Sequence, residues 1–279
     1  MRVKKYKSKM KLSKIIILSA LCMLAASCSP DIEKGLVLHS DFEGDARDES
    51  PNNYNGELRG RAEISEDSAV GESSVYFDGN RAYVEYPSEK VYFNTDYSVS
   101  IWVKWEEERQ FSRIFDFNQV LPGYGNSLSL YAGRPDKKGR NNLWLEQWAY
   151  VEDGTVKNII DVNKEPAEAA LEYDFQTGKW DHYVIVYKAS ALNLLGSKKD
   201  SKGLKVPFKG KLTLYVNGKK VDHTAHCLKP QNVPTVDNWL GRSRYTSDPL
   251  FKGWMDDFRI YDRCLTAKEI EELYNLGSE

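Results

Sequence analysis

The sequence predicts an all-β domain that folds as an antiparallel β-sandwich and ends in one short helix. Short runs rich in Val, Ile, Tyr, Phe and Trp alternate with clusters of Gly, Asn, Asp and Pro, which is the pattern of strands joined by turns. Residues 97–105 alternate strictly between two faces, as a strand does. Asn217 and Gly218 separate two strand-like runs, and this dipeptide is a strong signal for a hairpin turn.

The strand candidates cover much of the chain after its first 34 residues. In chain order they lie at residues 35–42, 74–80, 82–86, 97–105, 143–150, 180–187, 212–216 and 219–222. In the run 97–105 the odd-numbered residues are all apolar, which predicts that they face the core. Residues 180–187 are nearly all apolar toward their end, which indicates a strand in the middle of the sandwich.

The single predicted helix lies near the C-terminus. Thr266 and Glu269 have the spacing of a capping box, in which each side chain accepts a hydrogen bond from the other residue's backbone N–H. Ile270, Leu273 and Tyr274 then supply an apolar stripe of about two turns. Such a helix closes the domain and is not expected to form a site.

Two stretches, 134–178 and 189–210, are longer than the turns of a minimal sandwich. The first holds a polar loop, the aromatic run 143–150 and an acidic connector, and the second is rich in lysine. Long loops on a rigid β scaffold are where binding residues usually lie. We therefore expect these stretches to shape any ligand site.

Residues 1–27 are predicted to be a lipoprotein signal peptide. Residues 1–14 carry seven basic residues and no acidic one, and an apolar run that is too short to span a bilayer comfortably follows. Small residues then lead directly into Cys28. This arrangement resembles the bacterial lipobox, which would make Cys28 the acylated first residue of the mature protein. The alternative is an ordinary signal peptide cut at an Ala-x-Ala-like site, with Cys28 incidental.

The expected domain organisation follows from this leader. Residues 28–34 would form a lipidated tether, and residues 35–279 would form one domain of a size that a single β-sandwich can fill. The expected location is the bacterial cell envelope, with a lipid anchor in the outer membrane. The face of the membrane, periplasmic or external, stays open.

Removing the leader leaves an acidic protein. The whole chain has 39 basic and 41 acidic residues, and with the seven basic residues of the leader removed, 32 basic residues remain against 41 acidic ones. An acidic domain without a basic stripe argues against nucleic acid as a partner, because that affinity depends on neutralising phosphates. Membrane contact is expected through the lipid anchor only. Neutral or weakly charged ligands, or Ca²⁺, suit this charge balance better.

Cys227 and Cys264 are the cysteines that remain after Cys28. In an oxidising compartment they could form a disulfide, and they could equally be two buried apolar residues. Two cysteines do not make a disulfide framework, so a hydrophobic core must stabilise this fold.

A series of motifs comes in a family-like order along the chain. They lie at residues 98–104, 113–117, 180–184, 212–218, 238–243, 248–249, 253–261 and 263–270. Together they resemble the laminin-G-like, concanavalin-like jelly-roll domains that are common in glycan-processing proteins of gut and soil bacteria. The resemblance covers essentially all of residues 35–276 and implies a two-sheet jelly-roll sandwich. Cys264 departs from the family, which usually has Ala there.

The resemblance also implies a structural Ca²⁺ between the first loop and the last strand. The first loop, residues 48–56, resembles the family's Asp-x-Ser-Gly-Asn-Gly turn, and Asp48 and Asn52 are its candidate ligands, with Asp41 nearby. Asp256 on the last strand is the fourth candidate. Its parity with the apolar residues that follow predicts an inward side chain, which must be paired or bound to metal. The alternative is that Asp256 accepts backbone hydrogen bonds from the turn without metal.

A glycan site needs exposed aromatic rings that stack on sugar faces and polar groups that bind hydroxyls. Trp144, Glu146, Trp148 and Tyr150 share one face of the candidate strand 143–150 and would make such a platform. The alternative is that this face belongs to the core, since core aromatics are commoner than sugar platforms.

Arg242 and Arg244 are candidate ligands for hydroxyl or carboxylate groups. Arg242 also belongs to the family-like pattern, so a structural role is its alternative. No catalytic residue is predicted. Hydrolases of this fold place carboxylates on one face of a central strand, whereas the near match that begins at Glu43 lies in a loop.

The leading interpretation is a surface or periplasmic lipoprotein with a non-catalytic glycan-binding domain, accessory to polysaccharide capture or processing. Its expected partner is a polysaccharide or oligosaccharide, and other glycan-utilisation proteins are further candidates. One alternative is a glycoside hydrolase or lyase with an unrecognised site on the concave sheet. The other is a protein-binding adhesion module. The fold alone does not separate these classes.

Overall fold

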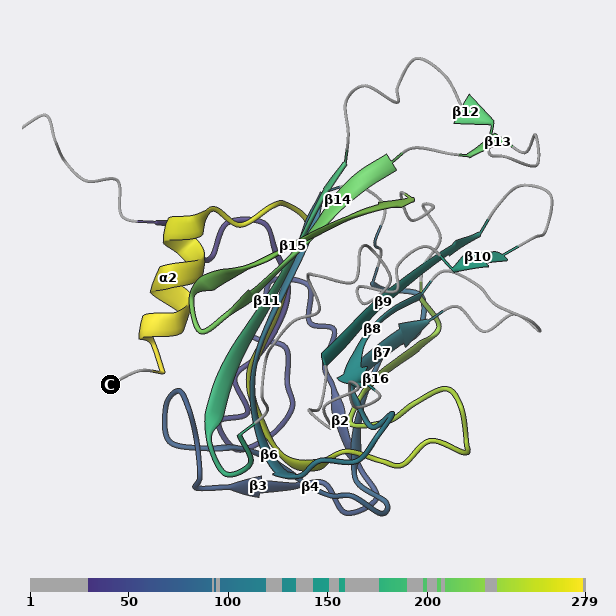
Figure 1. Cartoon of the computed structure of the whole chain (residues 1–279). Helices are drawn as coiled ribbons and strands as arrows, with labels where there is room; N and C mark the ends of the chain where they lie inside the picture. The colour runs from purple at the N-terminus through teal and green to yellow at the C-terminus, as the bar shows by residue number, and fades with distance from the viewer. Residues whose placement is uncertain are drawn as a thin grey trace, which may run out of the picture. The chain divides into compact units, whose positions relative to one another are not determined.

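The computed structural model describes the chain at residues 30–91, 93, 96–118, 127–133, 143–150, 156–158, 176–189, 198–199, 205–206, 209–228 and 235–277. Cys28 and the predicted signal peptide lie outside these residues. Internal contacts divide the chain into two units, Met1–Asp31 and Ile32–Glu279, and the second unit holds the β-sandwich (Figure 1). No described helix is long and apolar enough to cross a membrane.

Among the described residues, eight strands form one antiparallel sheet, in the order β15-β14-β11-β6-β17-β4-β3, with β1 also paired to β17. The strands of this sheet are β1 (Leu36–Ser40), β3 (Glu63–Ser65), β4 (Ser74–Asp78), β6 (Tyr97–Glu107), β11 (Trp180–Ala189), β14 (Lys209–Val216), β15 (Lys219–Leu228) and β17 (Lys252–Tyr261). The predicted hairpin is present, because β14 and β15 pair on either side of Asn217 and Gly218.

The second large sheet has seven described strands in the order β10-β9-β8-β7-β16-β5-β2. They are β2 (Glu57–Arg59), β5 (Tyr83–Tyr86), β7 (Arg113–Asn118), β8 (Ser127–Ala132), β9 (Leu143–Tyr150), β10 (Val156–Asn158) and β16 (Asp237–Leu240). A separate short pair consists of β12 (Lys198–Lys199) and β13 (Lys205–Val206). The predicted all-β, antiparallel, two-sheet jelly roll with a short C-terminal helix is confirmed.

The hydrophobic core lies between the inner faces of the two large sheets. All the odd-numbered residues of β6 from Tyr97 to Trp105 are buried in it, as their alternation predicted. Phe115 and Phe117 of the seven-stranded sheet contact Phe258 of the eight-stranded sheet, with ring centroids 6.5 and 5.8 Å apart. Burying one such side chain contributes about 1.5–3 kcal/mol, so these contacts stabilise the alignment of the sheets.

Helix α2 (Ala267–Asn275) covers the outer face of the eight-stranded sheet (Figure 1). Its capping box forms as predicted, with both the Thr266 and the Glu269 bonds present. Ile270 and Leu273 pack in a second cluster of buried side chains with Val184 of β11, whose neighbours Tyr183 and Ile185 belong to the main core. The helix therefore buries a sheet face that would otherwise be apolar and exposed.

A β-bulge in β17 changes the predicted orientation of Asp256. Met255 pairs with Val103 on the core side, and Asp256 pairs with Trp102, whose side chain points the other way. The register then shifts at Asp257, which has a left-handed backbone with φ of 44°, before the pairing resumes. The parity argument that placed Asp256 on the core face was therefore wrong, because the bulge adds a residue to the strand.

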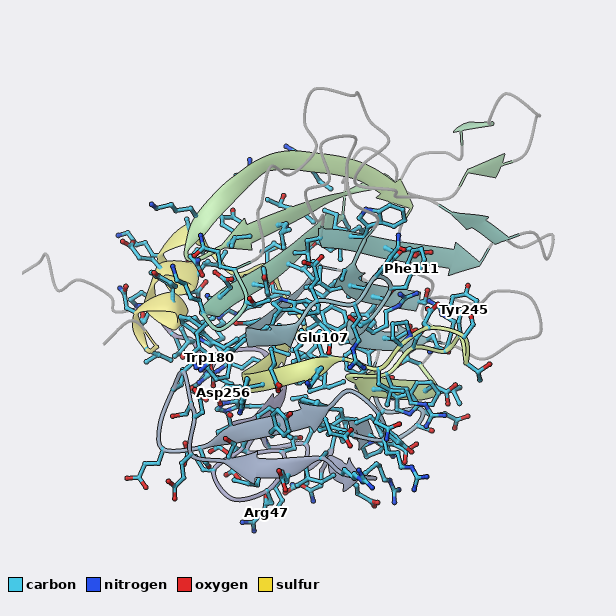
Figure 2. All side chains as sticks on the ribbon, turned by 60° about the horizontal axis from the view of Figure 1, so that its bottom comes forward. Arg47, Glu107, Phe111, Trp180, Tyr245 and Asp256 are labelled. Carbon is cyan, nitrogen blue, oxygen red and sulfur yellow. The ribbon has the colours of Figure 1, made fainter. Side chains whose placement is uncertain are left out.

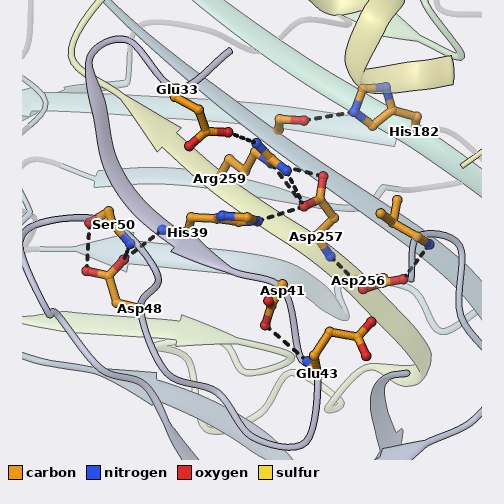
Figure 3. Close-up of polar contacts among 12 residues, drawn as sticks. Glu33, His39, Asp41, Glu43, Asp48, Ser50, His182, Asp256, Asp257 and Arg259 are labelled. Atoms are coloured by element: carbon orange, nitrogen blue, oxygen red, sulfur yellow. Dashed lines mark hydrogen bonds and ion pairs between the residues drawn. The ribbon is translucent and has the colours of Figure 1, made fainter. Parts of the chain in front are cut away.

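The bulge supports a buried polar network on the outer face of the eight-stranded sheet (Figure 3). The His39 ring donates from Nε2 to Asp257 Oδ1 at 2.8 Å, and the Arg259 guanidinium holds the same carboxylate at 2.9 Å. Burial alone would raise the pKa of Asp257, but the hydrogen bond from His39 and the charge of Arg259 hold it at about 2. These contacts give His39 a structural role in the network.

His182 is fully buried beside this network and has a different environment. Its ring stacks on Trp102 with centroids 4.9 Å apart, and Nε2 lies 2.8 Å from Ser100 Oγ. Tyr274 of α2 also stacks on Trp102, with ring centroids 5.6 Å apart. Burial lowers the pKa of His182 to about 3, so the ring is neutral in the folded protein.

The first loop is organised by the carboxylate of Asp48, one of the calcium candidates. Asp48 Oδ1 accepts the backbone N–H groups of His39 and Ser50, both at 2.9 Å. Oδ2 accepts the Tyr54 N–H at 2.6 Å and the Ser50 hydroxyl at 2.9 Å. A carboxylate offers about four lone-pair positions, so the protein itself satisfies this one (Figure 3).

The other calcium candidates have separate partners. Asp256 Oδ2 accepts the backbone N–H groups of Ala69 at 2.8 Å and Val70 at 2.9 Å, and burial raises the pKa of Asp256 to about 8. Asp41 accepts a backbone N–H, and Asn52 donates to a carbonyl. Across the described residues, no group of three or more His, Cys, Asp or Glu side chains could hold a metal ion. The calcium site stays a prediction that these contacts do not favour.

Cys264 carries a free thiol. The thiol lies 3.3 Å from the Tyr187 carbonyl, and burial raises its pKa to about 11. The disulfide between Cys227 and Cys264 that the sequence left open is not formed, because the Cys264 thiol is free. The side chain of Cys227 lies outside the described part of the chain.

Replacing His182 with Gln is expected to flatten the acid limb of the stability curve. In the wild type the His182 ring has a pKa of about 6.5 in the unfolded chain and of about 3 in the folded chain. Between these two pH values only the unfolded chain binds the proton. The free energy of unfolding should therefore fall by up to about 1.4 kcal/mol per pH unit as the pH drops below about 6. Urea melts at pH 7 and pH 4.5 measure this slope. Equal slopes for the wild type and the variant would contradict the assignment.

Replacing Asp48 with Ala is expected to lower the free energy of unfolding by about 3 kcal/mol, because it leaves several backbone N–H groups without an acceptor. Asp45 in the same loop is the matched control, since its side chain is 46% exposed. Asp45→Ala should change stability by less than about 0.5 kcal/mol.

Thermal melts in EGTA test calcium binding directly, and we expect no shift of the melting temperature. A melting temperature that falls in EGTA and recovers with CaCl₂ would establish the calcium site instead.

Candidate functional site

The outer face of the seven-stranded sheet carries a row of polar and aromatic side chains. Residues of this sheet that point inward, such as Leu130, Leu145 and Leu240, belong to the core. Their neighbours point the opposite way. The strand register aligns one row of them across five strands, in the order Glu85, Trp239, Asp116, Ser129 and Glu146. This row forms the floor of the candidate site.

Asp116 is the fully buried charge at the centre of this floor. Its Oδ2 accepts the backbone N–H of Arg244 at 3.0 Å, and its Oδ1 lies 3.3 Å from Nη2 of the same arginine. Arg113 lies beside it, and Arg113 Nη2 reaches Asp248 Oδ2 at 3.3 Å. Removing one partner of a buried ion pair costs about 3–5 kcal/mol. These pairs therefore fix the segment 242–248 to the sheet.

Glu146 lies at the other end of the row and accepts a hydrogen bond from the Tyr131 hydroxyl at 2.5 Å. Burial raises the pKa of Glu146, against the lowering effects of Tyr131 and of the nearby arginines. Asp237 on β16 also has a raised pKa, first because of burial and then because of the charge of Asp116.

Trp144 projects from the same face as Glu146, while Leu143 and Leu145 lie in the core. Its half-buried ring packs against Tyr131, with centroids 5.8 Å apart, and over Gly133. A Cβ at Gly133 would come within 2.1 Å of the indole, so only glycine leaves room for the ring. Trp148 and Tyr150 belong to β9, but their side chains lie outside the described residues.

A pocket of about 330 Å³ opens where the segment after β16 passes over this sheet. Tyr83, Trp239 and Arg242 line it, together with the turn before β5 and the residues that follow Arg242. The Arg242 guanidinium lies over both rings, 4.4 Å from the Trp239 centroid and 4.6 Å from the Tyr83 centroid. Figure 2 shows Tyr245, which also lines the pocket, on the opposite side of the view from Trp180 and Asp256.

Gly241 places Arg242 at this position. Its φ of 80° turns the chain directly after β16, and a Cβ there would come within 2.7 Å of the Phe77 ring. The Gly241 N–H donates to the Ile114 carbonyl at 2.9 Å, and its carbonyl accepts the Phe251 N–H at 2.9 Å. The turn is therefore anchored on both sides, and Arg242 leaves it over the aromatic rings.

The site thus combines residues that the sequence predicted with residues that it missed. Arg242 and Arg244 both lie here, and Trp144 and Glu146 lie on the same sheet face. Sequence reasoning missed the central Asp116, as well as Tyr83 and Trp239. The parity of Trp239 against the apolar Leu240 was an available signal, but only strand register shows that these residues are neighbours. The calcium candidates belong to the other sheet and the first loop.

The arrangement can bind a polar ligand that has flat faces. Tyr83 offers an aromatic surface, Arg242 and Asn80 offer hydrogen-bond donors, and Glu146 on the same sheet face offers a carboxyl group. Glycoside hydrolysis requires two carboxyl groups that are free to act as acid and as base or nucleophile. Asp116 is engaged by Arg244 through both of its oxygens, which favours a structural role for it.

Solved structures of similar fold include several binding domains. One is domain 4 of AbnA, an extracellular GH43 arabinanase from Geobacillus stearothermophilus, in complex with arabinotriose. It is 19% identical, with a TM-score of 0.57, and the match covers 86% of this chain and 98% of that one. The binding domain of Paraclostridial Mosquitocidal Protein 1 is 18% identical, with a TM-score of 0.55 and coverage of 88% and 53%.

A third structure is the binding domain of botulinum neurotoxin DC in complex with SialylT, at 16% identity and a TM-score of 0.53. The match covers 88% of this chain and 52% of that one, so the chain spans about half the length of the toxin domains. At these identities the likeness shows the fold alone. No curated protein sequence matches the chain.

A family model provides the stronger relation. The model described as concanavalin A-like lectin/glucanases superfamily matches residues 78–195 and 205–271, which together make up more than half of the chain. The match includes the strands that carry Asp116, Glu146 and Trp239. The protein therefore belongs to the concanavalin A-like lectin/glucanases superfamily.

Proposed function

We propose that this protein is a non-catalytic glycan-binding lipoprotein of the bacterial cell envelope, accessory to the capture or processing of polysaccharides. The observation that carries the proposal is the pocket on the seven-stranded sheet, where Tyr83 and Trp239 lie beside the Arg242 guanidinium. Rings beside hydrogen-bond donors suit a sugar, whose faces are apolar and whose edges carry hydroxyls.

The state of the carboxyl groups supports binding over hydrolysis. Asp116 is buried and tied to Arg244, so it is poorly placed to attack a sugar or to activate water. Glu146 accepts a hydrogen bond from Tyr131, and hydrolysis at this residue would need a second free carboxyl group within about 5–10 Å of it. A polysaccharide screen that also measures product release distinguishes the two functions.

The similar structures give further support. The arabinanase domain is in complex with arabinotriose, and the neurotoxin binding domain is in complex with SialylT. A domain of this fold can therefore serve as a binding module attached to another activity. We propose the same role here, with the lipid on Cys28 in place of a covalently attached enzyme.

Replacing Tyr83 or Trp144 with Ala is expected to weaken glycan retention at least about tenfold, the effect of losing about 1.4 kcal/mol of binding free energy. Affinity electrophoresis of the purified full-length protein in gels that contain candidate polysaccharides measures the change.

The outer face of the eight-stranded sheet offers matched controls. Tyr76 and Trp254 are also half-buried, and their rings pack on each other with centroids 4.9 Å apart. Tyr76→Ala and Trp254→Ala should bind like the wild type, while melting curves confirm that all the variants fold. If the wild type retains no polysaccharide, or if the two pairs of variants lose binding equally, the glycan site is not on this face.

Replacing Cys28 with Ser is expected to abolish lipid attachment, because the thiol is the acylated atom. In cells fed an alkyne-labelled fatty acid, the wild type should be labelled and should sediment with membranes, while Cys28→Ser should carry no label. Cys264→Ala serves as the control and should be labelled normally. A wild type that is secreted without a label would support the ordinary signal peptide instead.

A further inference from the structure

The pocket on the seven-stranded sheet contains a cation, the guanidinium of Arg242, that has no hydrogen-bond acceptor among the described residues. The Arg242 guanidinium lies over the rings of Trp239 and Tyr83, whose planes are inclined at 78° to each other, and none of the described residues accepts a hydrogen bond from it or forms an ion pair with it. A guanidinium has five N–H donors in a planar fork. Contact with the two rings restricts the position of the group, and its N–H donors stay available to a ligand.

The other charges that line the pocket differ from Arg242. Arg244 is paired with Asp116, and Asp248 is paired with Arg113. Their ion pairs hold the wall of the pocket to the sheet. Arg81 is exposed at the rim, and it too lacks an ion pair among the described residues. Among the charged residues that line the pocket, those without an ion pair to the described residues are therefore positive. The Asp237 carboxyl group interacts with Arg242 electrostatically but is not part of the lining.

This local charge is opposite to that of the whole chain, in which 41 acidic residues outnumber 39 basic ones. The overall balance favoured a neutral or weakly charged ligand, but an ion pair forms over a few ångströms and responds to the nearest groups. The volume of about 330 Å³ falls within the usual range for small-ligand sites.

We propose that this pocket binds a carboxylate-bearing sugar, with the carboxylate paired to the fork of Arg242 and the sugar ring beside Tyr83. The proposal rests on the proposed glycan-binding function and names the ligand class. A planar carboxylate matches the guanidinium through two parallel hydrogen bonds. Asn80 and Thr246, which also line the pocket, supply groups for the sugar hydroxyls.

The test is isothermal titration of the full-length protein in detergent with single sugars. The probes are D-glucuronate, D-galacturonate, D-mannuronate and N-acetylneuraminate, set against glucose, galactose, mannose and galactose 6-sulfate. We expect at least one carboxylated sugar to bind at least about tenfold more tightly than its neutral parent. The affinity should fall as NaCl is raised, because salt screens the pair.

Arg242→Gln should remove the preference for the carboxylate, and Arg242→Lys should restore only part of it, because lysine keeps the charge without the fork. Arg47→Gln removes the same charge from an exposed loop position, 67% exposed, and should change nothing. Figure 2 shows Arg47 well apart from Tyr245 of the pocket. Melting curves identify any variant that is unfolded.

The outcomes separate this inference from the proposed function. If neutral polysaccharides are retained and Arg242→Gln binds them as the wild type does, the inference fails and the function stands. If a carboxylated sugar binds through Arg242 but no polysaccharide is retained, the pocket stands and the function fails. Equal affinity for the sulfated sugar overturns the choice of carboxylate. If no sugar of either kind binds, both fail.

Discussion

The ion pairs around Asp116 organise the site. A buried carboxylate must be paired, because removing a charge from water costs several kcal/mol. Arg244 supplies that pairing from a segment far along the chain, and Arg113 extends it to Asp248. Ion pairs therefore fix the wall of the pocket to its floor. Arg242 differs because its contacts within the described part of the chain are with aromatic rings, which do not accept hydrogen bonds from its N–H groups as a carboxylate would.

The fold could be read from the sequence wherever local patterns match local structure. The alternation of residues 97–105, the hairpin at Asn217 and the capping box at Thr266 all depend on neighbours in the chain. The orientation of Asp256 could not be read, because a bulge breaks the period of two without a sequence signal strong enough to reveal it. Beyond a bulge, counting alternate residues assigns side chains to the wrong face of the sheet, even where the sequence alternates regularly.

The site was predictable in part for the same reason. Alternation correctly separated Trp144 and Glu146 from the leucines beside them, since β9 is regular there. It could not show that Trp239, Asp116 and Glu146 belong to one row, because register across strands depends on contacts between segments distant in sequence. Net charge describes the whole chain, whereas the arginines among the residues that line the pocket depart locally from that average.

The anchoring of Gly241 has a consequence for how such a protein can change over evolution. Its two backbone hydrogen bonds, to Ile114 and Phe251, close the segment that follows β16 into a loop with fixed ends. Doubling the length of a flexible loop costs only about 0.6 kcal/mol. Insertions beyond Arg244 would therefore be tolerated, and they would reshape the rim of the pocket while Arg242 stays on its rings. Ligand preference can thus diversify in descendants without any change to the scaffold.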